Sequence, residues 1–326
     1  MIVGAATAPR DRADDGGLTV YLSSGGGLTQ FGAYVDRLTP RGVSSERHWH
    51  SAEDEFVYVL SGVATVVDDD GAHVIGPGDA ACWPHGCENA HHLINRSDAP
   101  VTYLIVGSRV ALDICTYPDS GQRQINHATT WEVVDGGGAR LRGGDLPPHL
   151  LNLPGVWGQP FDAANPTPRV LSAAKASLPV WVEADDVPHP VLGAGPGPYA
   201  YQLLSDPGGL TQFGAFLETL PPGSQSGHRH WHEGEDEMVY ILSGEVVLVE
   251  DTENTLHPGD CACWPAGSPI GHRLDNRSSA PVTYLVIGTR AMTDIIHYSD
   301  HDLITHKDGT ERRYLRADGT EYRRKT

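Results

Sequence analysis

The sequence repeats itself once along its length. The segment GGLTQFGA at 26–33 returns unchanged at 208–215, and His-Trp-His at 48–50 returns at 230–232. Both copies continue in the same order with Glu-Asp-Glu, Leu-Ser-Gly, Cys-Trp-Pro and Asn-Arg-Ser, and a single-residue deletion near 250–257 shifts the second copy. Two copies of one domain explain this pattern, because a solenoid would need shorter and more numerous units.

Each copy is typical of an all-β domain. In the first copy, β-rich runs at 31–38, 55–60, 63–67 and 101–106 are separated by turn signals such as Gly76-Pro77-Gly78-Asp79. The 38 Gly and 24 Pro residues support a fold with many turns, and no long amphipathic helix is evident. We therefore expect two closed or sandwiched β-domains.

The length of 326 residues suits about two domains. We predict an N-terminal domain over 1–120, an irregular linker over 121–168 and a C-terminal domain over 169–326. The linker is rich in Gly and Pro, and its Trp131, Trp157 and Phe161 suggest that it packs on a barrel. The basic tail from 305 carries Asp308-Gly309, a hairpin-turn signal; it either docks on the acidic body or a partner subunit, or stays solvated.

The charge and the cysteines restrict the partners and the compartment. A formal net charge of −19 disfavours nucleic acid and anionic membranes as partners. Five cysteines without a framework spacing disfavour a disulfide scaffold. No apolar run approaches the roughly 20 residues that span a bilayer, and the first residues do not resemble a signal peptide. We expect a cytoplasmic protein.

Histidines and a glutamate recur at metal-binding intervals. Residues two apart in a strand project from the same face, so His48 and His50 can share one ion. Glu55 would then lie on the opposite face, so the strand must turn within 51–54. The second copy has His272-Arg273 where the first has His91-His92; because arginine is not a plausible ligand, His91 is the counterpart of His272. The candidate ligands are His48, His50, Glu55 and His91 in the first copy and His230, His232, Glu237 and His272 in the second.

This donor set suits a divalent transition metal (Fe, Mn, Zn or Ni), up to one per domain, and favours no single metal. Two alternatives stay open. Glu53 competes with Glu55, and Glu235 with Glu237, because both copies carry both. His228 also offers an alternative ligand set with His230 and His232.

Glu46 and His228 are the candidate catalytic residues. They occupy equivalent positions, two residues before the first ligand histidine, and alternation predicts that they share the ligand face. They are candidates for general acid–base groups or for partners of the ligands; the alternative is a rim residue in solvent. Their different identities predict unequal chemistry in the two domains.

Each copy resembles a cupin domain. The first cupin motif is Gly, five residues, His-x-His, three or four residues, Glu, six residues and Gly; the second is Gly, five residues, Pro-x-Gly, two residues, His, three residues and Asn. The first copy matches them with Gly42, His48, His50, Glu55 and Gly62, then Gly78, Pro84, Gly86, His91 and Asn95. Two departures are a gap of four residues before His91 and before His272, and a leading Gly223 that comes one residue early.

The resemblance covers roughly 18–117 and 180–299, and the sequence of the motifs is similar to that of small bacterial cupins with an HWH…EDE signature. It implies jelly-roll-like β-barrels with the metal inside, and a homodimer, since cupins often pair. The implied function is a metal-dependent enzyme acting on a small polar metabolite. Dioxygenase chemistry comes first because two-barrel cupins recur among dioxygenases, followed by isomerase, lyase or hydrolase chemistry. A non-catalytic barrel that binds a metal or a small ligand is the alternative, and one barrel of two is often not catalytic.

Overall fold

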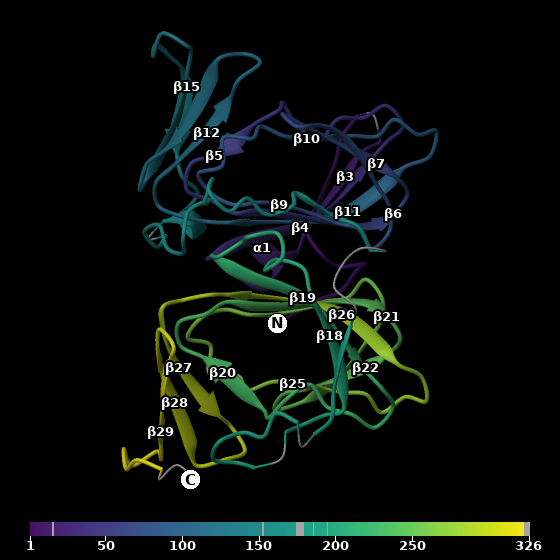
Figure 1. The fold of residues 1–326 in the computed structure, drawn as a ribbon, viewed down its shortest axis with the longest axis vertical. Helices are drawn as coiled ribbons and strands as arrows, with labels where there is room; N and C mark the ends of the chain where they lie inside the picture. Colours follow the sequence, from purple (N-terminus) through teal and green to yellow (C-terminus); the bar gives the residue numbers. More distant parts are fainter. Residues whose placement is uncertain (15, 152, 174–178, 185, 194, 323–326) are drawn as a thin grey trace.

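The protein consists of two β-barrels stacked on each other (Figure 1). The structure is a computed structural model that describes residues 1–14, 16–151, 153–173, 179–184, 186–193 and 195–322. The only helices in these ranges are α1 (Leu22–Gly26) and the short 3-10 helix η1 (Pro148–Leu150). The predicted all-β class with two tandem barrels is confirmed. None of the described helices has the length and apolarity to cross a membrane.

Three antiparallel sheets form the N-terminal barrel. The seven-stranded sheet runs in the order β16 (Val170–Leu171), β9 (Ala80–Trp83), β6 (Glu55–Ser61), β11 (Val101–Ser108), β4 (Phe31–Leu38), β3 (Leu18–Tyr21), β2 (Arg10–Arg12). The three-stranded sheet is β10 (His92–Ile94), β7 (Ala64–Asp68), β8 (Gly71–Ile75), and the five-stranded sheet is β15 (Arg140–Asp145), β14 (Thr130–Val134), β13 (Gln122–Asn126), β12 (Asp113–Tyr117), β5 (Trp49–His50).

The C-terminal barrel repeats this plan. Its seven-stranded sheet is β1 (Ile2–Val3), β24 (Cys261–Trp264), β21 (Glu237–Ser243), β26 (Val282–Thr289), β19 (Phe213–Leu220), β18 (Tyr199–Leu203), β17 (Val180–Val182). The smaller sheets are β23 (Glu253–Leu256), β22 (Val246–Val249), β25 (Arg273–Asp275), and β20 (His230–His232), β27 (Thr293–Tyr298), β28 (Leu303–Asp308), β29 (Glu311–Leu315).

The two seven-stranded sheets face each other and share one core. Alternate residues of β6, such as Phe56 and Tyr58, point out of their barrel and join a cluster that contains Met238 and Tyr240 of β21. The intervening residues point into each barrel and form separate clusters. Strands buried on both faces read as nearly continuous apolar runs, which is the pattern of β6 and β21. Each fully buried aromatic side chain contributes roughly 1.5–3 kcal/mol, so this shared core stabilises the stacking of the barrels.

The barrels also exchange edge strands. The start of the chain, β1, pairs with β24 of the C-terminal barrel, and the marked N terminus lies on that side of the interface (Figure 1). Conversely, β16, which precedes the C-terminal barrel in sequence, pairs with β9 of the N-terminal barrel. Each exchanged strand covers an edge that would otherwise expose unpaired backbone groups. Domain boundaries drawn from the sequence alone, at 120 and 169, do not represent this exchange.

The segment 121–168 is more regular than the sequence indicated. Its first part forms β13, β14 and β15, which extend the sheet of β5 and β12 through successive hairpins. The described residues of the remainder, 146–151 and 153–168, are mostly irregular and include η1. There Trp157 packs as expected, and its Nε1 donates to the Gln212 carbonyl oxygen at 2.9 Å. The basic tail likewise forms the β28–β29 hairpin, whose turn contains Gly309 at φ 54°.

Two glycines of the repeated GGLTQFGA segment allow the barrels to approach closely. A Cβ on Gly26 would overlap the side chain of Cys263, and a Cβ on Gly208 would overlap the side chain of Cys82. Both cysteines are fully buried in the shared core. The repeat therefore places a glycine of each domain against a cysteine of the other.

We expect Gly26→Ala and Gly208→Ala each to destabilise the protein by roughly 1–3 kcal/mol, because an added methyl group overpacks a rigid core. Urea unfolding followed by tryptophan fluorescence measures the effect. Gly155→Ala is the control, since a Cβ there meets nothing within 4 Å. An unchanged unfolding midpoint for both interface variants would contradict the close packing.

Candidate metal centres

Backbone pairing brings the predicted ligands of the N-terminal barrel together. His50 lies in β5, and His48, just before β5, forms a bridge with His91 through reciprocal backbone hydrogen bonds of 3.1 and 2.9 Å. Glu55 is the first residue of β6. Between them, residues 51–54 leave β5 and turn, as the spacing required. The side chains of all four ligand candidates are at most 20% exposed.

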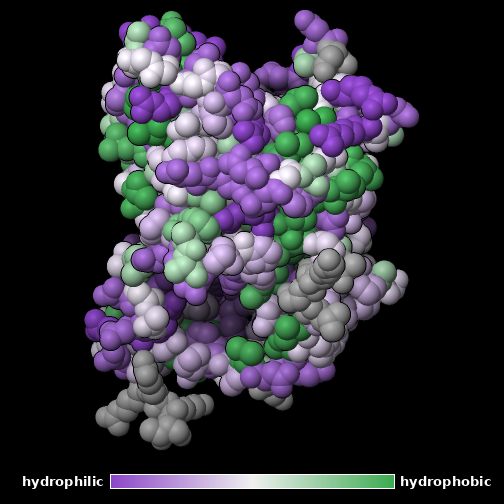
Figure 2. Space-filling view, turned by 45° about the horizontal axis from the view of Figure 1, so that its top comes forward, coloured by the Kyte–Doolittle hydropathy of each residue, from purple (hydrophilic) through white to green (hydrophobic). Residues whose placement is uncertain are grey.

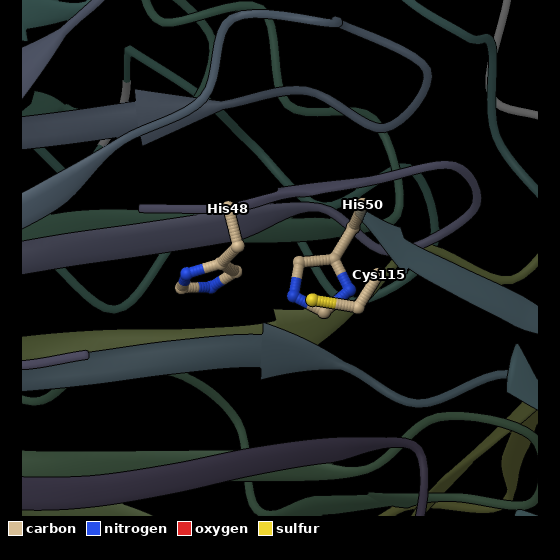
Figure 3. Close-up of side chains that lie close together, drawn as sticks. All are labelled: His48, His50 and Cys115. Carbon is tan, nitrogen blue, oxygen red and sulfur yellow. The ribbon is translucent and has the colours of Figure 1, made fainter. Parts of the chain in front are cut away.

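The donor atoms converge on one place. The Nε2 atom of His91 lies 2.9 Å from Oε2 of Glu55, and the Nε2 atom of His48 lies 3.7 Å from the same oxygen. His48 and His50 have ring centroids 5.2 Å apart, and the two imidazoles project to the same side (Figure 3). The structure thus brings donor atoms of His48, Glu55 and His91 within 4.8 Å of one another, and a donor nitrogen of His50 lies equally close to one of His48.

The C-terminal barrel repeats the cluster. The Nε2 atoms of His272 and His232 lie 3.1 and 3.9 Å from Oε2 of Glu237, and His230 forms a bridge with His272. His230, His232 and Glu237 offer donor atoms within 4.8 Å of one another. The two sites are therefore alike in their predicted ligands.

Every candidate imidazole is oriented through its other nitrogen. Nδ1 of His50 lies 2.7 Å from Oδ2 of Asp113, and Nδ1 of His232 lies 2.5 Å from Oδ2 of Asp294. The other four, His48, His91, His230 and His272, place Nδ1 at 2.8–3.4 Å from a backbone carbonyl oxygen. An oxygen beside Nδ1 holds the proton there and leaves the Nε2 lone pair for a metal ion.

Sequence reasoning missed Asp113 and Asp294, although a signal existed. Both begin an Asp-Ile pair at equivalent places in the two copies. Each aspartate also fixes the turn between the ligands, since Asp113 accepts from the Ala52 amide at 2.9 Å and Asp294 from the Gly234 amide at 2.7 Å. One carboxylate thus orients an imidazole and holds the loop that leads to the ligand glutamate.

Tryptophans hold the third histidine of each site. The ring of Trp83 stacks on His91 with centroids 3.7 Å apart, and that of Trp264 stacks on His272 at 3.7 Å. Both indoles are buried. They restrict rotation of the imidazoles, so these tryptophans serve the site as well as the core.

The electrostatics of the sites favour a cation. Burial works to raise the pKa of Glu55, but His91 and His48 outweigh it and hold the pKa well below its usual range. The pKa of Glu237 is likewise held below its usual range, because His272 outweighs the effect of burial. Burial, helped by His272, lowers the pKa of His230 to about 4. The sites thus combine a charged carboxylate with buried imidazoles.

These residues fit a divalent transition metal. The Nε2 atoms of two histidines in each barrel lie 2.9–3.9 Å from one carboxylate oxygen. Three imidazoles and one carboxylate match the donor preferences of Zn, Fe, Mn and Ni.

The competing glutamates occupy a different place. Oε2 of Glu53 lies 3.7 Å from Nδ1 of His50, and Oε2 of Glu235 lies 3.6 Å from Nδ1 of His232, on the side away from the Nε2 atoms. Glu235 also pairs with Lys307 at 2.5 Å. In the N-terminal barrel the lysine is replaced by Asn126, which pairs with Asp113 in the sheet as Lys307 pairs with Asp294. Burial raises the pKa of Glu53 to about 7.

Neither Glu46 nor His228 is among the residues that border the cavities beside the two clusters. Glu46 is exposed, and its carbonyl oxygen lies 2.9 Å from Nδ1 of His48. The ring of His228 lies instead near His189, 6.0 Å between centroids, and His301, 5.2 Å. The alternation argument does not apply here because β5 and β20 begin only at Trp49 and His230, so no strand includes these residues.

Each site opens into a cavity of different lining. The N-terminal cavity measures about 390 Å³ and is bordered by the polar groups Tyr34, Asp36, Tyr103, Tyr117 and Gln124. The C-terminal cavity measures about 320 Å³ and is bordered by Leu203, Phe216 and Val286 besides three of its ligand candidates and the charged residues Glu235, Asp236 and Arg290. The space-filling view shows a hollow among hydrophilic residues in its lower half, on the side of the C-terminal barrel (Figure 2). The two barrels therefore offer unequal environments.

Cys115 makes the sites differ further. Its sulfur lies within 4.8 Å of donor nitrogens of His48 and His50 (Figure 3). It pairs with His50 in the sheet, whereas Ile296 pairs with His232 at the corresponding place. The N-terminal site thus has the thiol of Cys115 beside its imidazoles, whereas the C-terminal site has the aliphatic side chain of Ile296. All five cysteines are buried, and the described residues contain no disulfide.

The comparisons with known proteins agree with this geometry. The cupin domain family matches residues 34–107 and 216–288. The chain is a bicupin. Its architecture is that of a Lactobacillus farciminis oxalate decarboxylase in complex with formate, with 18% identity, a TM-score of 0.55, and coverage of 90% of this chain and 88% of that chain.

A mutant Bacillus subtilis oxalate decarboxylase is similar at 18% identity and a TM-score of 0.54, covering 92% of this chain and 78% of that one. A cupin from Silicibacter pomeroyi described as a sugar phosphate isomerase is 44% identical over 38% of this chain and 80% of that chain, with a TM-score of 0.37. No curated protein matches the sequence.

We expect His50→Ala and His232→Ala each to remove about one metal ion per chain, because each change deletes one imidazole donor. Metal analysis of protein purified without added metal, by mass spectrometry, measures this. Exposed His73→Ala, outside both clusters, is the control. Unchanged metal content in both ligand variants would show that the clusters are not the metal sites.

An acid–tyrosine pair also lies inside each barrel. The hydroxyl of Tyr103 donates to Oδ2 of Asp36 at 3.4 Å, and that of Tyr284 donates to Glu218. Burial is the main cause that raises the pKa of Asp36, and it raises the pKa of Glu218 to about 7. Both carboxyls therefore keep a proton at higher pH than in water.

This raised pKa of Glu218 predicts a pH dependence of stability. The folded protein keeps the proton up to about pH 7, whereas the unfolded chain releases it near 4.5, so this carboxyl lowers the free energy of unfolding as pH rises between those values. Glu218→Gln removes that loss. In metal-free protein, we expect the variant to have a higher free energy of unfolding than wild type. This difference should be up to about 3 kcal/mol larger at pH 8 than at pH 5, measured by denaturant unfolding. The same gain in exposed Glu245→Gln would contradict the assignment.

Proposed function

We propose that this bicupin is a metal-dependent enzyme that transfers protons on a small polar metabolite, as an isomerase or a lyase does, in its N-terminal barrel. The observation that carries the proposal is the cavity beside His48, His50, Glu55 and His91. Its wall carries hydroxyl and carboxyl groups on the side facing the cluster, chiefly Tyr34, Asp36 and Tyr103. A volume of about 390 Å³ suits one small ligand.

The metal would be held by the three imidazoles and Glu55, and when bound it would polarise an oxygen atom of the substrate. The chain's own residues supply the remaining chemistry. Asp36 accepts a hydrogen bond from Thr19 at 2.6 Å as well as from Tyr103. A carboxyl whose pKa is raised by burial and that accepts from a tyrosine hydroxyl is suited to general acid–base catalysis.

The other polar groups would bind and orient the substrate. Burial raises the pKa of Tyr34, so its phenol stays protonated, and Tyr34 would serve as a hydrogen-bond donor to a ligand in the cavity that it borders. Gln124 and Tyr117 border the same space and offer further donors and acceptors. A substrate with several oxygen atoms would satisfy these groups better than an apolar one.

The C-terminal barrel is the weaker candidate for catalysis. Phe216 occupies the place of Tyr34, since Phe216 pairs with Leu203 where Tyr34 pairs with Tyr21. Ile296 occupies the place of Cys115, and Glu235 is bound by Lys307. We therefore assign this barrel a supporting metal site.

The dioxygenase chemistry expected from the two-barrel architecture is the alternative. The donor set would also suit iron. We rank proton transfer first because the cavity of the N-terminal barrel is bordered by groups that exchange protons. The cytoplasmic location, the homodimer, and the exclusion of nucleic acid and membrane as partners stay predictions from the sequence.

The test is an activity screen of the metal-loaded protein with small hydroxy acids, keto acids and sugars in deuterated water. Nuclear magnetic resonance detects deuterium incorporation and isomerisation, and an oxygen electrode runs in parallel. We expect deuterium exchange without oxygen uptake, and a loss of rate of 10²-fold or more in Asp36→Asn, because it loses its acid–base group. Glu218→Gln, the matched change in the other barrel, should keep the rate.

Oxygen uptake with an active substrate would favour dioxygenation instead. An equal loss of rate in Glu218→Gln and Asp36→Asn would contradict the assignment of the reaction to the N-terminal barrel.

A further inference from the structure

One pair of residues in the repeated GGLTQFGA segment borders neither cavity beside the metal clusters, yet it contacts the loops of both sites. The Thr-Gln pair within each GGLTQFGA segment crosses the interface between the barrels. Residues 29 and 30, from the N-terminal domain, contact Asp236, and residues 211 and 212, from the C-terminal domain, contact Asp54. Asp54 and Asp236 directly precede the ligands Glu55 and Glu237.

Gln212 holds the loop of the N-terminal site by three polar contacts. Its Oε1 accepts from the Asp54 amide at 2.9 Å, and its Nε2 donates to the Ala52 carbonyl at 2.9 Å. It also accepts a hydrogen bond from Ser108. The side chain is fully buried, and its Nε2 also donates to the backbone carbonyl oxygen of Trp157 at 2.9 Å.

The carboxylate of Asp54 completes this contact. Its Oδ2 accepts from the amides of Thr211 and Gln212 at 2.7 and 2.9 Å, and its Oδ1 accepts from the amide of His85 at 2.8 Å. Asp54 is fully buried. A buried carboxylate needs such donors to offset its lost hydration, and two of them come from the other domain.

Gln30 makes the two corresponding contacts with the loop of the C-terminal site. Its Oε1 accepts from the Asp236 amide at 3.0 Å, and its Nε2 donates to the Gly234 carbonyl at 2.9 Å. Oδ2 of Asp236 accepts from the amides of Thr29 and Gln30 at 2.6 and 2.8 Å. The arrangement is reciprocal, since each domain holds the loop of the other.

The held loop is the segment that joins two metal ligands. In the N-terminal barrel, residues 51–54 connect His50 to Glu55, and Ala52 also donates to the Asp113 carboxylate that orients His50. Fixing Ala52 and Asp54 from outside therefore fixes both ends of the ligand pair. Ligand positions within a few tenths of an ångström matter for metal affinity, and residues that orient ligands typically change it 10–100-fold.

We propose that Gln212 and Gln30 are positioning residues that act crosswise, so that each metal site is completed by the opposite domain. Gln212 positions Glu55 and His50, and Gln30 positions Glu237 and His232. This inference needs the ligand clusters but not the reaction proposed above. A protein that binds metal and catalyses no proton transfer would leave it intact.

The experiment measures Co²⁺ affinity at one site at a time in the full-length chain. His232→Ala leaves the N-terminal site, and His50→Ala leaves the C-terminal site. Into each background we place Gln212→Ala or Gln30→Ala, and Co²⁺ binding is followed by its visible absorption bands, which also report the coordination geometry.

We expect Gln212→Ala to weaken Co²⁺ binding at the N-terminal site 10-fold or more and at the C-terminal site less than 2-fold. Gln30→Ala should give the reverse. Thr211→Val is the matched control. The Thr211 hydroxyl donates to the Gln159 carbonyl oxygen at 2.8 Å and makes no hydrogen bond with the loop. This variant should leave both affinities within 2-fold.

Three results would overturn the proposal: no change at either site, equal losses at both sites, or a loss at the site of the glutamine's own domain. Gln212→Met, which keeps the length of the side chain and removes its polar atoms, covers the case in which the alanine variant does not fold. If both Gln212 variants unfold where Thr211→Val stays folded, the contact is a determinant of folding and the assignment to the metal site is wrong.

Discussion

The convergence of imidazole nitrogens on one buried carboxylate oxygen is the interaction on which each barrel depends. Oε2 of Glu55 lies 2.9 Å from His91 and 3.7 Å from His48, and the second barrel repeats the contact around Glu237. Such a cluster has little apolar contact of its own to hold it. Aspartates, backbone carbonyls and stacked tryptophans on the surrounding strands therefore fix its geometry.

The two clusters are alike, whereas their surroundings are not. Where the N-terminal site has Tyr34 and Cys115, the C-terminal site has Phe216 and Ile296 at the equivalent positions. A metal ion in equal donor sets would therefore meet a polar cavity in one barrel and a more apolar one in the other. Because the environment of a site decides what its metal can do, the asymmetry of the cavities carries more information about function than the symmetry of the ligands.

The sequence predicted which histidines and glutamates lie together because they recur in two copies at fixed intervals, and the turn at 51–54 follows from strand alternation alone. It did not predict the places of Glu46 and His228, because alternation was applied beyond the ends of very short strands. The exchange of β1 and β16 was also out of reach. Edge pairing between distant segments leaves no periodicity in a single chain, since it depends on how the barrels stack.

The repeat itself separates two kinds of constraint. Residues that hold one barrel against the other, Gly26, Thr29 and Gln30, are identical in the second copy, as are the ligands. Some residues that border the cavities differ, as Tyr34 of the first copy and Phe216 of the second do. A contact made reciprocally must satisfy the same geometry in both directions, so a change in either copy would disturb a loop in the other barrel. A residue that borders one cavity has no such partner, and this freedom allows one barrel to hold a substrate while its twin retains only the metal cluster.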